Sequence, residues 1–276
     1  MKLVILSDLH LPVRGIPFSA LLGERVFAKI NMLTTRRNAH KEEIARKAIE
    51  KAASLNPDHI LITGDFSNMA HPKEFEKARA LLKPLWDPKL LSVVPGNHDL
   101  YVAEGRKYFE QYFGELIWGA TGVRNYPGYK ELKDGVGLLL FRSPMYLPGP
   151  VSLGRVTRDQ LVRAEAIVRL SEMEFLIAAF HHNIHKRGPF VELTGRLIGR
   201  NTLVRRLASL GVGLIVTGHD HNHREYSVDT PSGEVKVICN GSSSRTKRAF
   251  ITEVHIEHGE VRTRLYTFSE SSGEFL

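Results

Sequence analysis

Carboxylate, amide and imidazole side chains directly follow five short apolar segments of this chain. These side chains belong to Asp8 and His10, to Asp65, to Asn97 with His98 and Asp99, to His181 with His182, and to His219 with His221. Each preceding segment has the length and the Val, Ile and Leu content of a buried strand. Because open α/β sheets place their chemistry at the carboxyl ends of the strands, we expect these groups to converge. Oxygen ligands mixed with imidazoles indicate a metal site, and they are too many for one ion.

The spacing inside these groups suits metal coordination. In Asp8-x-His10 and His219-x-His221 both side chains fall on the same side of an extended segment, so each pair can bind one ion. A glycine allows a tight turn before Asp65, whose two carboxylate oxygens can bridge two cations. Each motif alone is more often an ordinary turn or strand end. The ordered set of five makes the metal site the better interpretation.

Two amphipathic helices, at 41–54 and 73–83, alternate with the first three strand segments. This alternation predicts a βαβαβ unit with a mainly parallel sheet. Further along, Thr157 to Gln160 has capping-box spacing and opens a helix that ends near Leu170. The last third alternates short strands with turns, which predicts a second and more antiparallel sheet. We expect one α/β domain over residues 1–276, with two sheets flanked by helices.

Composition limits the class of protein. The chain has 276 residues with 42% hydrophobic content, enough for one large domain. Its net charge of +8 favours an anionic partner, such as a phosphate compound, a nucleic acid or an acidic membrane surface. The single cysteine, Cys239, excludes an intramolecular disulfide and favours a reducing compartment. The apolar stretch Leu3 to Leu6 is too short for a signal peptide, and no segment reaches the ~18 apolar residues of a membrane span. We therefore expect a cytoplasmic protein, either free or peripheral on the inner face of the membrane.

The ordered motifs Asp8-x-His10, Gly64-Asp65, Gly96-Asn97-His98-Asp99, His181 and Gly218-His219-x-His221 resemble the calcineurin-like metallophosphoesterase superfamily over roughly the whole chain. The resemblance implies a four-layer α/β/β/α sandwich and hydrolysis of a phosphoester by a metal-activated hydroxide. It implies one metal ion held by Asp8, His10, Asp65 and His221, and a second held by Asp65, Asn97, His181 and His219. Manganese is the first choice for both ions, and Fe, Zn, Ni and Co also suit ligands that include no thiolate.

The resemblance also assigns roles to two residues that are not ligands. His98 corresponds to the catalytic histidine that stabilises the transition state or protonates the leaving group. Asp99 would hold the His98 imidazole in one orientation. An equally good interpretation makes Asp99 the N-cap of a helix from Leu100.

Residues 14–40 bear on the substrate. Apolar Leu22, Val26, Phe27, Ile30 and Leu33 fall at helical spacing among basic Arg25, Lys29, Arg36 and Arg37. This basic amphipathic insert either packs on the sheet or contacts a membrane surface or acyl chain. It is similar to that of the UDP-2,3-diacylglucosamine pyrophosphatases of lipid A synthesis, which release UMP and a lipid monophosphate. Candidate substrate contacts are Arg37, His40, His182, Lys186 and Arg187.

Several alternatives remain open at this point. A cyclic-nucleotide or general phosphodiesterase would have the same metal ligands, and the insert would then serve packing alone. A nuclease is less favoured and no nucleic-acid partner is expected, because no aromatic and basic strand platform is present. A metal-bound scaffold without catalysis is disfavoured because the ligands and His98 are all present. The sequence does not predict an oligomeric state.

Overall fold

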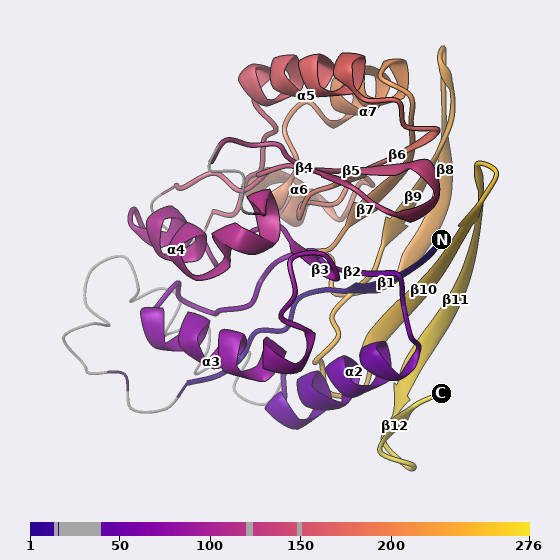
Figure 1. Cartoon of the computed structure of the whole chain (residues 1–276). Helices are drawn as coiled ribbons and strands as arrows, with labels where there is room; N and C mark the ends of the chain where they lie inside the picture. Colours follow the sequence, from indigo (N-terminus) through magenta and orange to yellow (C-terminus); the bar gives the residue numbers. More distant parts are fainter. Residues whose placement is uncertain (14–15, 17–39, 120–123, 148–150) are drawn as a thin grey trace.

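Two six-stranded sheets pack face to face at the centre of the computed structural model, which describes residues 1–13, 16, 40–119, 124–147 and 151–276 (Figure 1). The first sheet has the order β12 (Glu274–Phe275), β11 (Glu260–Ser269), β10 (Phe250–Glu257), β1 (Lys2–Leu6), β2 (His59–Ile62) and β3 (Leu91–Val93). The second has the order β4 (Gly128–Glu131), β5 (Val136–Leu140), β6 (Phe175–Ala179), β7 (Val212–Thr217), β9 (Gly233–Cys239) and β8 (Arg224–Thr230).

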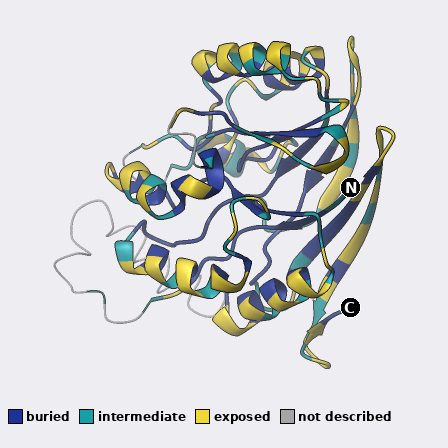
Figure 2. Ribbon diagram, viewed as in Figure 1, coloured by how far each residue is buried: buried dark blue, intermediate teal, exposed yellow. Residues whose placement is uncertain are grey.

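Helices cover the outer faces of both sheets. They are α2 (Glu42–Ser54), α3 (Pro72–Leu82), α4 (Gly105–Trp118), α5 (Arg158–Leu170) and α7 (Arg200–Ser209). The structure also has a short helix α6 (Pro189–Gly195) and the 3-10 turns η2 (Lys83–Leu85) and η3 (Lys133–Gly135). In Figure 1, α2 and α3 lie below the first sheet, and α5 and α7 lie above the second. Figure 2 shows the exposed residues on the outer sides of these helices and the buried ones toward the sheets. The predicted α/β/β/α sandwich is confirmed.

Side chains that point alternately to the two faces of each strand account for the four layers. In β5, Leu138 and Leu140 join the main core between the sheets, whereas Leu139 joins a second core beneath α5 and α7. Strand side chains point alternately to opposite faces, so a strand that is apolar at every position must be covered on both sides. The apolar runs that predicted buried strands therefore also specify a layer on each side of the sheet.

The strands of the last third do not form one sheet, contrary to the prediction. β10 pairs antiparallel with β1 and β11 pairs with β10, so both extend the first sheet. β9 instead pairs parallel with β7 in the second sheet. Short strands separated by turns indicate local hairpins, and they carry no information about which distant strand edge receives each hairpin.

The predicted basic insert lies outside the described residues except for Ile16 and His40, and Arg37 is among the residues not described. Within the described chain, no helix is long and apolar enough to cross a membrane.

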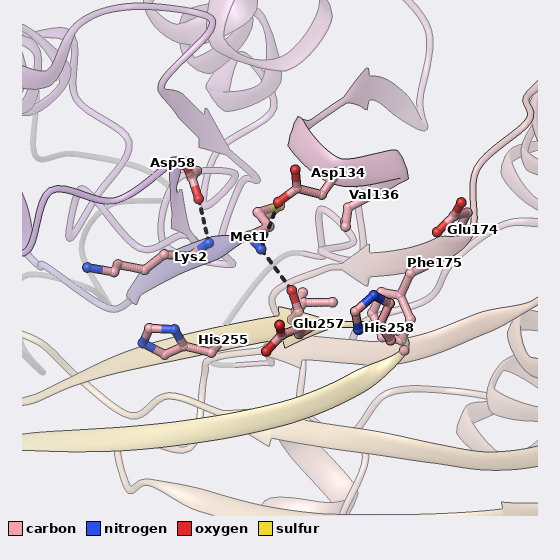
Figure 3. A pocket seen from close by; sticks show the side chains of 12 residues that line it. Met1, Lys2, Asp58, Asp134, Val136, Glu174, Phe175, His255, Glu257 and His258 are labelled. Carbon is pink, nitrogen blue, oxygen red and sulfur yellow. Dashed lines mark hydrogen bonds and ion pairs between the residues drawn. The ribbon is translucent and has the colours of Figure 1, made fainter.

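A cavity of about 650 Å³ lies at the edge of the sheets where β1 begins (Figure 3). Its wall includes Met1, whose amine donates to the Ile256 carbonyl at 2.8 Å and pairs with Asp134 at 3.0 Å. None of the predicted metal ligands lines this cavity. The carboxyl ends of the parallel strands, and the ligands that follow them, lie at the other end of the sheets.

His59, the first residue of β2, makes stability depend on pH. Its ring is buried, with Nδ1 3.0 Å from the Lys89 carbonyl oxygen and Nε2 2.8 Å from Ser92 Oγ. Burial, together with the charge of Lys130, lowers the pKa of His59 to about 3, so the folded protein keeps the ring neutral. Below pH 6.5, the pKa of this histidine in the unfolded chain, the unfolded chain binds a proton that the native state does not bind. Each further pH unit of acidification therefore lowers the free energy of unfolding by about 1.4 kcal/mol.

We expect acidification from pH 7 to pH 5 to remove about 2 kcal/mol more stability from the wild type than from a His59→Gln variant. Urea unfolding of both proteins at the two pH values would measure this difference. His255→Gln, which replaces an exposed imidazole on β10, should lose stability on acidification as the wild type does. An equal acid loss in His59→Gln and wild type would show that His59 is not the group responsible.

Candidate metal centre

Five of the seven predicted ligands lie in tight turns at the carboxyl ends of the strands. Asp8, His10, Asp65, His219 and His221 have φ angles of 51°, 44°, 57°, 71° and 58°. Residues other than glycine rarely adopt this left-handed region, which costs on the order of 1–3 kcal/mol and is concentrated at functional sites. The turns aim the side chains inward at the expense of local backbone stability.

Four side chains form a first ligand group. One ligand atom from each of Asp8, His10, Asp65 and His221 lies within 4.8 Å of all the others. His10 Nε2 is 3.1 Å from His221 Nε2 and 3.4 Å from Asp65 Oδ2. His221 Nε2 is 3.3 Å from Asp8 Oδ1. Two carboxylates and two imidazoles thus surround a space of the size of one ion.

The chemistry of this group fits a cation. Asp8 Oδ1 is fully buried and has no hydrogen-bond partner among the described residues. Burial raises the pKa of Asp8, but the His221 and His181 imidazoles outweigh it and hold the pKa well below its usual range, so the carboxylate stays charged. A buried anionic oxygen without a donor is costly unless a cation neutralises it. A divalent metal ion would satisfy it.

A second group lies beside the first. Asn97 Oδ1 is 3.0 Å from His181 Nε2 and 2.9 Å from His219 Nδ1, and these two nitrogens are 3.2 Å apart. Each ring uses its other nitrogen to donate to a backbone carbonyl, His181 to Thr63 at 2.7 Å and His219 to Gly195 at 3.0 Å. In the neutral rings the converging nitrogens therefore carry lone pairs, the arrangement of metal-binding imidazoles.

Asp65 connects the two groups. Its Oδ2 lies 3.4 Å from His10 Nε2 in the first group and 3.5 Å from His181 Nε2 in the second. The other oxygen, Oδ1, accepts the backbone N–H of His98 at 2.8 Å. Gly96 makes room for this carboxylate, because a Cβ at Gly96 would overlap Asp65 Oδ1 and the Asp65 backbone nitrogen. One oxygen shared by two sets of ligands is the geometry of a bridging carboxylate.

His98 is held by a loop that follows β2. Its Nδ1 donates to the Asn68 carbonyl at 2.8 Å, and its ring centroid is 5.0 Å from that of His10. The loop is fixed by Glu74, whose buried carboxylate accepts the backbone N–H groups of Asn68, Met69 and His71 at 3.0–3.1 Å. The role of Glu74 was not predicted from the sequence, although the residue stands three positions after the N-cap of α3, which is the capping-box position.

Asp99 does not have the partner expected for it. Its carboxylate accepts backbone N–H groups from Asp65, Ser67 and Gly96 at 2.8–2.9 Å, and the Ser67 hydroxyl at 3.0 Å. Burial and the Asp65 charge raise the pKa of Asp99 to about 7. The residue therefore ties together the two loops that carry Asp65 and Asn97, whereas the His98 ring is oriented by a carbonyl.

The predicted substrate contacts on the second sheet have other partners. His182 is fully buried; its Nε2 donates to the Ser152 carbonyl at 2.7 Å and its Nδ1 lies 3.0 Å from Ser143 Oγ. Burial and His181 lower the pKa of His182 to about 3, so the ring is neutral, and its role in substrate contact stays a prediction. Arg187 Nη1 donates to Asp220 Oδ1 at 3.2 Å, and Lys186 is exposed.

Asp220 lies between the two ligands of the last motif and positions their loop. Its carboxylate is 2.9 Å from His185 Nε2 and accepts Arg187 Nη1 at 3.2 Å and Arg224 Nε at 3.1 Å. Burial raises its pKa, and His185 and Arg187 outweigh that effect and keep it charged. Asp220 was not predicted from the sequence, although its position between the ligands His219 and His221 indicates a role in holding their loop.

We expect Asp220→Asn to weaken Mn²⁺ binding by about 10- to 100-fold, since partners that orient ligands have effects of this size. Neutralising the side chain weakens its contacts with three basic groups and loosens the turn that presents His219 and His221. Calorimetric titration of the metal-free protein with Mn²⁺ would measure the change. Asp229→Asn, an exposed carboxylate on β8, is the matched control. Equal affinities in the two variants would refute the positioning role.

A model of the calcineurin-like phosphoesterases matches residues 1–223. The chain belongs to this family. A curated relative, a probable cyclic nucleotide phosphodiesterase from Vesicomyosocius okutanii, is 23% identical over 137 residues, which are 50% of this chain and 50% of that protein.

Solved structures share the fold of this calcineurin-like phosphoesterase. A purple acid phosphatase from yellow lupin seeds has a TM-score of 0.60 at 11% identity, over 100% of this chain and 52% of that one. A 5'-nucleotidase precursor from Thermus thermophilus has a TM-score of 0.53 at 14% identity, over 100% and 56% of the two chains. The chain thus spans about half the length of each of these three relatives.

Proposed function

We propose that this chain is a two-metal hydrolase of phosphodiester or diphosphate bonds, formed as a single domain over residues 1–276. The observation that carries the proposal is the position of Asp65 Oδ2, 3.4 Å from His10 and 3.5 Å from His181, between two groups of ligands. Two bound metal ions, Mn²⁺ or another of Fe, Zn, Ni and Co, would supply Lewis acidity and an activated hydroxide.

The side chains around the ligands have defined tasks in this proposal. Asp8, His10, Asp65 and His221 would hold the first ion, and Asp65, Asn97, His181 and His219 would hold the second. With Nδ1–H donating to the Asn68 carbonyl, the imidazolium form of His98 would stabilise charge on the substrate or give its Nε2 proton to the leaving oxygen. Asp99 is a positioning residue that holds the Asp65 and Asn97 loops together.

For the substrate, we propose an acylated nucleotide diphosphate, specifically UDP-2,3-diacylglucosamine, cleaved to UMP and a lipid monophosphate. Two apolar side chains on α6, Phe190 and Leu193, are 76% and 68% exposed. The same helix ends at Gly195, whose carbonyl accepts from His219, so an apolar face lies next to the second ligand group. Exposed Lys186 adds positive charge nearby, which suits an anionic lipid at the inner face of the membrane.

Cyclic-nucleotide hydrolysis is the second candidate. The observation that favours it is the curated relative, a probable cyclic nucleotide phosphodiesterase, which matches half of this chain. In that case the apolar face of α6 would have no part in substrate binding, and truncating its side chains would leave turnover unchanged.

The first experiment is hydrolysis of UDP-2,3-diacylglucosamine by Mn²⁺-loaded protein in detergent, with 3',5'-cyclic AMP assayed alongside. A His98→Ala variant controls for contaminating activity and should be about 100-fold slower or worse. Release of UMP by the wild type, reduced in a Phe190→Ser/Leu193→Ser double variant, supports the lipid substrate. Turnover of the cyclic nucleotide without UMP release would withdraw it in favour of the second candidate.

A further inference from the structure

His40 is fixed beside the first ligand group by a serine-rich loop that follows β9. The backbone N–H of Lys41 donates to the Ser244 carbonyl at 3.0 Å, and His40 forms a β-bridge with Arg245. The His40 ring places Nδ1 2.9 Å from Ser244 Oγ, and with the Ser244 hydroxyl donating to Nδ1 the neutral ring carries its hydrogen on Nε2. The side chain is 8% exposed, and these contacts are among those that hold it.

The same loop also holds the segment that carries Asp8. The Ser242 hydroxyl donates to the Asp8 carbonyl at 2.8 Å, and Ser244 Oγ lies 3.2 Å from the same oxygen. His40 and Asp8 are therefore positioned by one structural unit, and a displacement of either is transmitted to the other. An imidazole held in this way has the fixed geometry that a binding residue needs.

His40 lies at the rim of the first ligand group. Its ring centroid is 4.4 Å from that of His10 and 5.3 Å from that of His221. One nitrogen from each of the three rings lies within 4.8 Å of the others, but His40 is absent from the compact group that includes Asp8 and Asp65. It is thus close to what that group would bind.

His10 is flanked by two imidazoles that are not in the compact ligand group. The His98 ring is 5.0 Å from His10 and the His40 ring is 4.4 Å from it. A tetrahedral phosphate bound next to His10 presents several anionic oxygens, and one donor cannot serve all of them. An imidazole N–H is a suitable partner for a phosphate oxygen, because hydrogen bonds to charged groups are the stronger ones.

We propose that His40 is a substrate-binding residue that donates a hydrogen bond to a non-bridging phosphate oxygen held at the Asp8–His10–Asp65–His221 group. The inference rests on the proposed function, since it presumes a phosphate at these ligands. His40 binds the phosphate itself and is indifferent to the rest of the substrate, so it serves a nucleotide diphosphate and a cyclic nucleotide alike.

The test uses the full chain loaded with Mn²⁺ and measures binding of inorganic phosphate by calorimetry, which requires no turnover. The proteins are the wild type, His40→Ala, His40→Gln and His255→Gln, the last being the matched control on β10. We expect His40→Ala to weaken phosphate binding by about tenfold or more, as a hydrogen bond to a charged group implies. His40→Gln retains a donor and should fall between His40→Ala and the wild type.

Two further measurements distinguish phosphate binding by His40 from metal binding and from packing. The metal content of the His40 variants, measured by mass spectrometry, should equal that of the wild type. Loss of metal in His40→Gln would make His40 a metal ligand and overturn the proposal. Phosphate affinity equal to that of His255→Gln would make it a packing residue. With bis(p-nitrophenyl) phosphate, KM should rise more than kcat falls. A wild type that binds phosphate but cleaves no ester would refute the proposed function and leave the role of His40 intact.

Discussion

Asp65→Asn should lower kcat/KM by at least about 1000-fold, or roughly 4 kcal/mol of transition-state stabilisation. The variant keeps the shape of the side chain and removes the charge of the oxygen that faces both His10 and His181. Both ligand groups lose their shared anion, so both ions should bind more weakly. Steady-state kinetics with bis(p-nitrophenyl) phosphate, together with metal content, would measure the two effects.

Asp58→Asn is the matched control, since that carboxylate also lies near β2 but faces the opposite edge of the sheets, where it accepts from the Lys2 backbone. It should leave metal content and kcat/KM within about twofold of the wild type. If Asp65→Asn retained its metal content and its activity, Asp65 would not be the bridging ligand and the two-metal proposal would fail.

The second large effect concerns Gly96→Ala, in which a single methyl group should abolish most activity. The added Cβ would overlap the Asp65 backbone nitrogen and Oδ1, and backbone cannot move aside as a flexible side chain can. Overpacking of this kind typically costs about 1–3 kcal/mol of stability. The displaced Asp65 should also reduce kcat/KM by about 100-fold, since small misplacements of a site have effects of that size.

Gly188→Ala gives the comparison, because a Cβ at Gly188 would meet nothing within 4 Å and its φ of −58° suits any residue. Thermal unfolding and Mn²⁺-dependent hydrolysis of both variants separate a local steric effect from the general effect of replacing glycine. Wild-type activity in Gly96→Ala would mean that the loops carrying Asp65 and Asn97 tolerate a greater separation than the structure has.

The sequence predicts the frame of the site well because each ligand directly follows a buried strand. Asp8, Asp65 and His219 are examples, each two or three residues beyond a run of apolar side chains. The helices that matched, such as α2 and α5, have apolar residues at helical spacing or an N-capping threonine. These signals are local, and local interactions determine whether a segment becomes a helix or a strand.

Side-chain partners could not be predicted in the same way. Asp99 meets backbone amides of Asp65 and Ser67, more than thirty residues earlier in the chain, and His182 meets Ser143 and Ser152 on neighbouring segments. Such contacts depend on how the loops pack in three dimensions. The sheet that β10 and β11 join could not be predicted for the same reason. β10 pairs with β1, which is about 250 residues away in the sequence, and β11 pairs with β10.

The two halves of the candidate centre come from different sheets. Asp8, Asp65 and Asn97 follow strands of the first sheet, and His181, His219 and His221 follow strands of the second. Bound metal would therefore act as a cross-link between the sheets and couple their opening to metal release. Each ion would add RT ln(1 + [metal]/Kd) to the free energy of unfolding, about 2.7 kcal/mol at a hundredfold excess over Kd. Metal supply in the cell would then set the lifetime of the fold as well as the rate of the reaction.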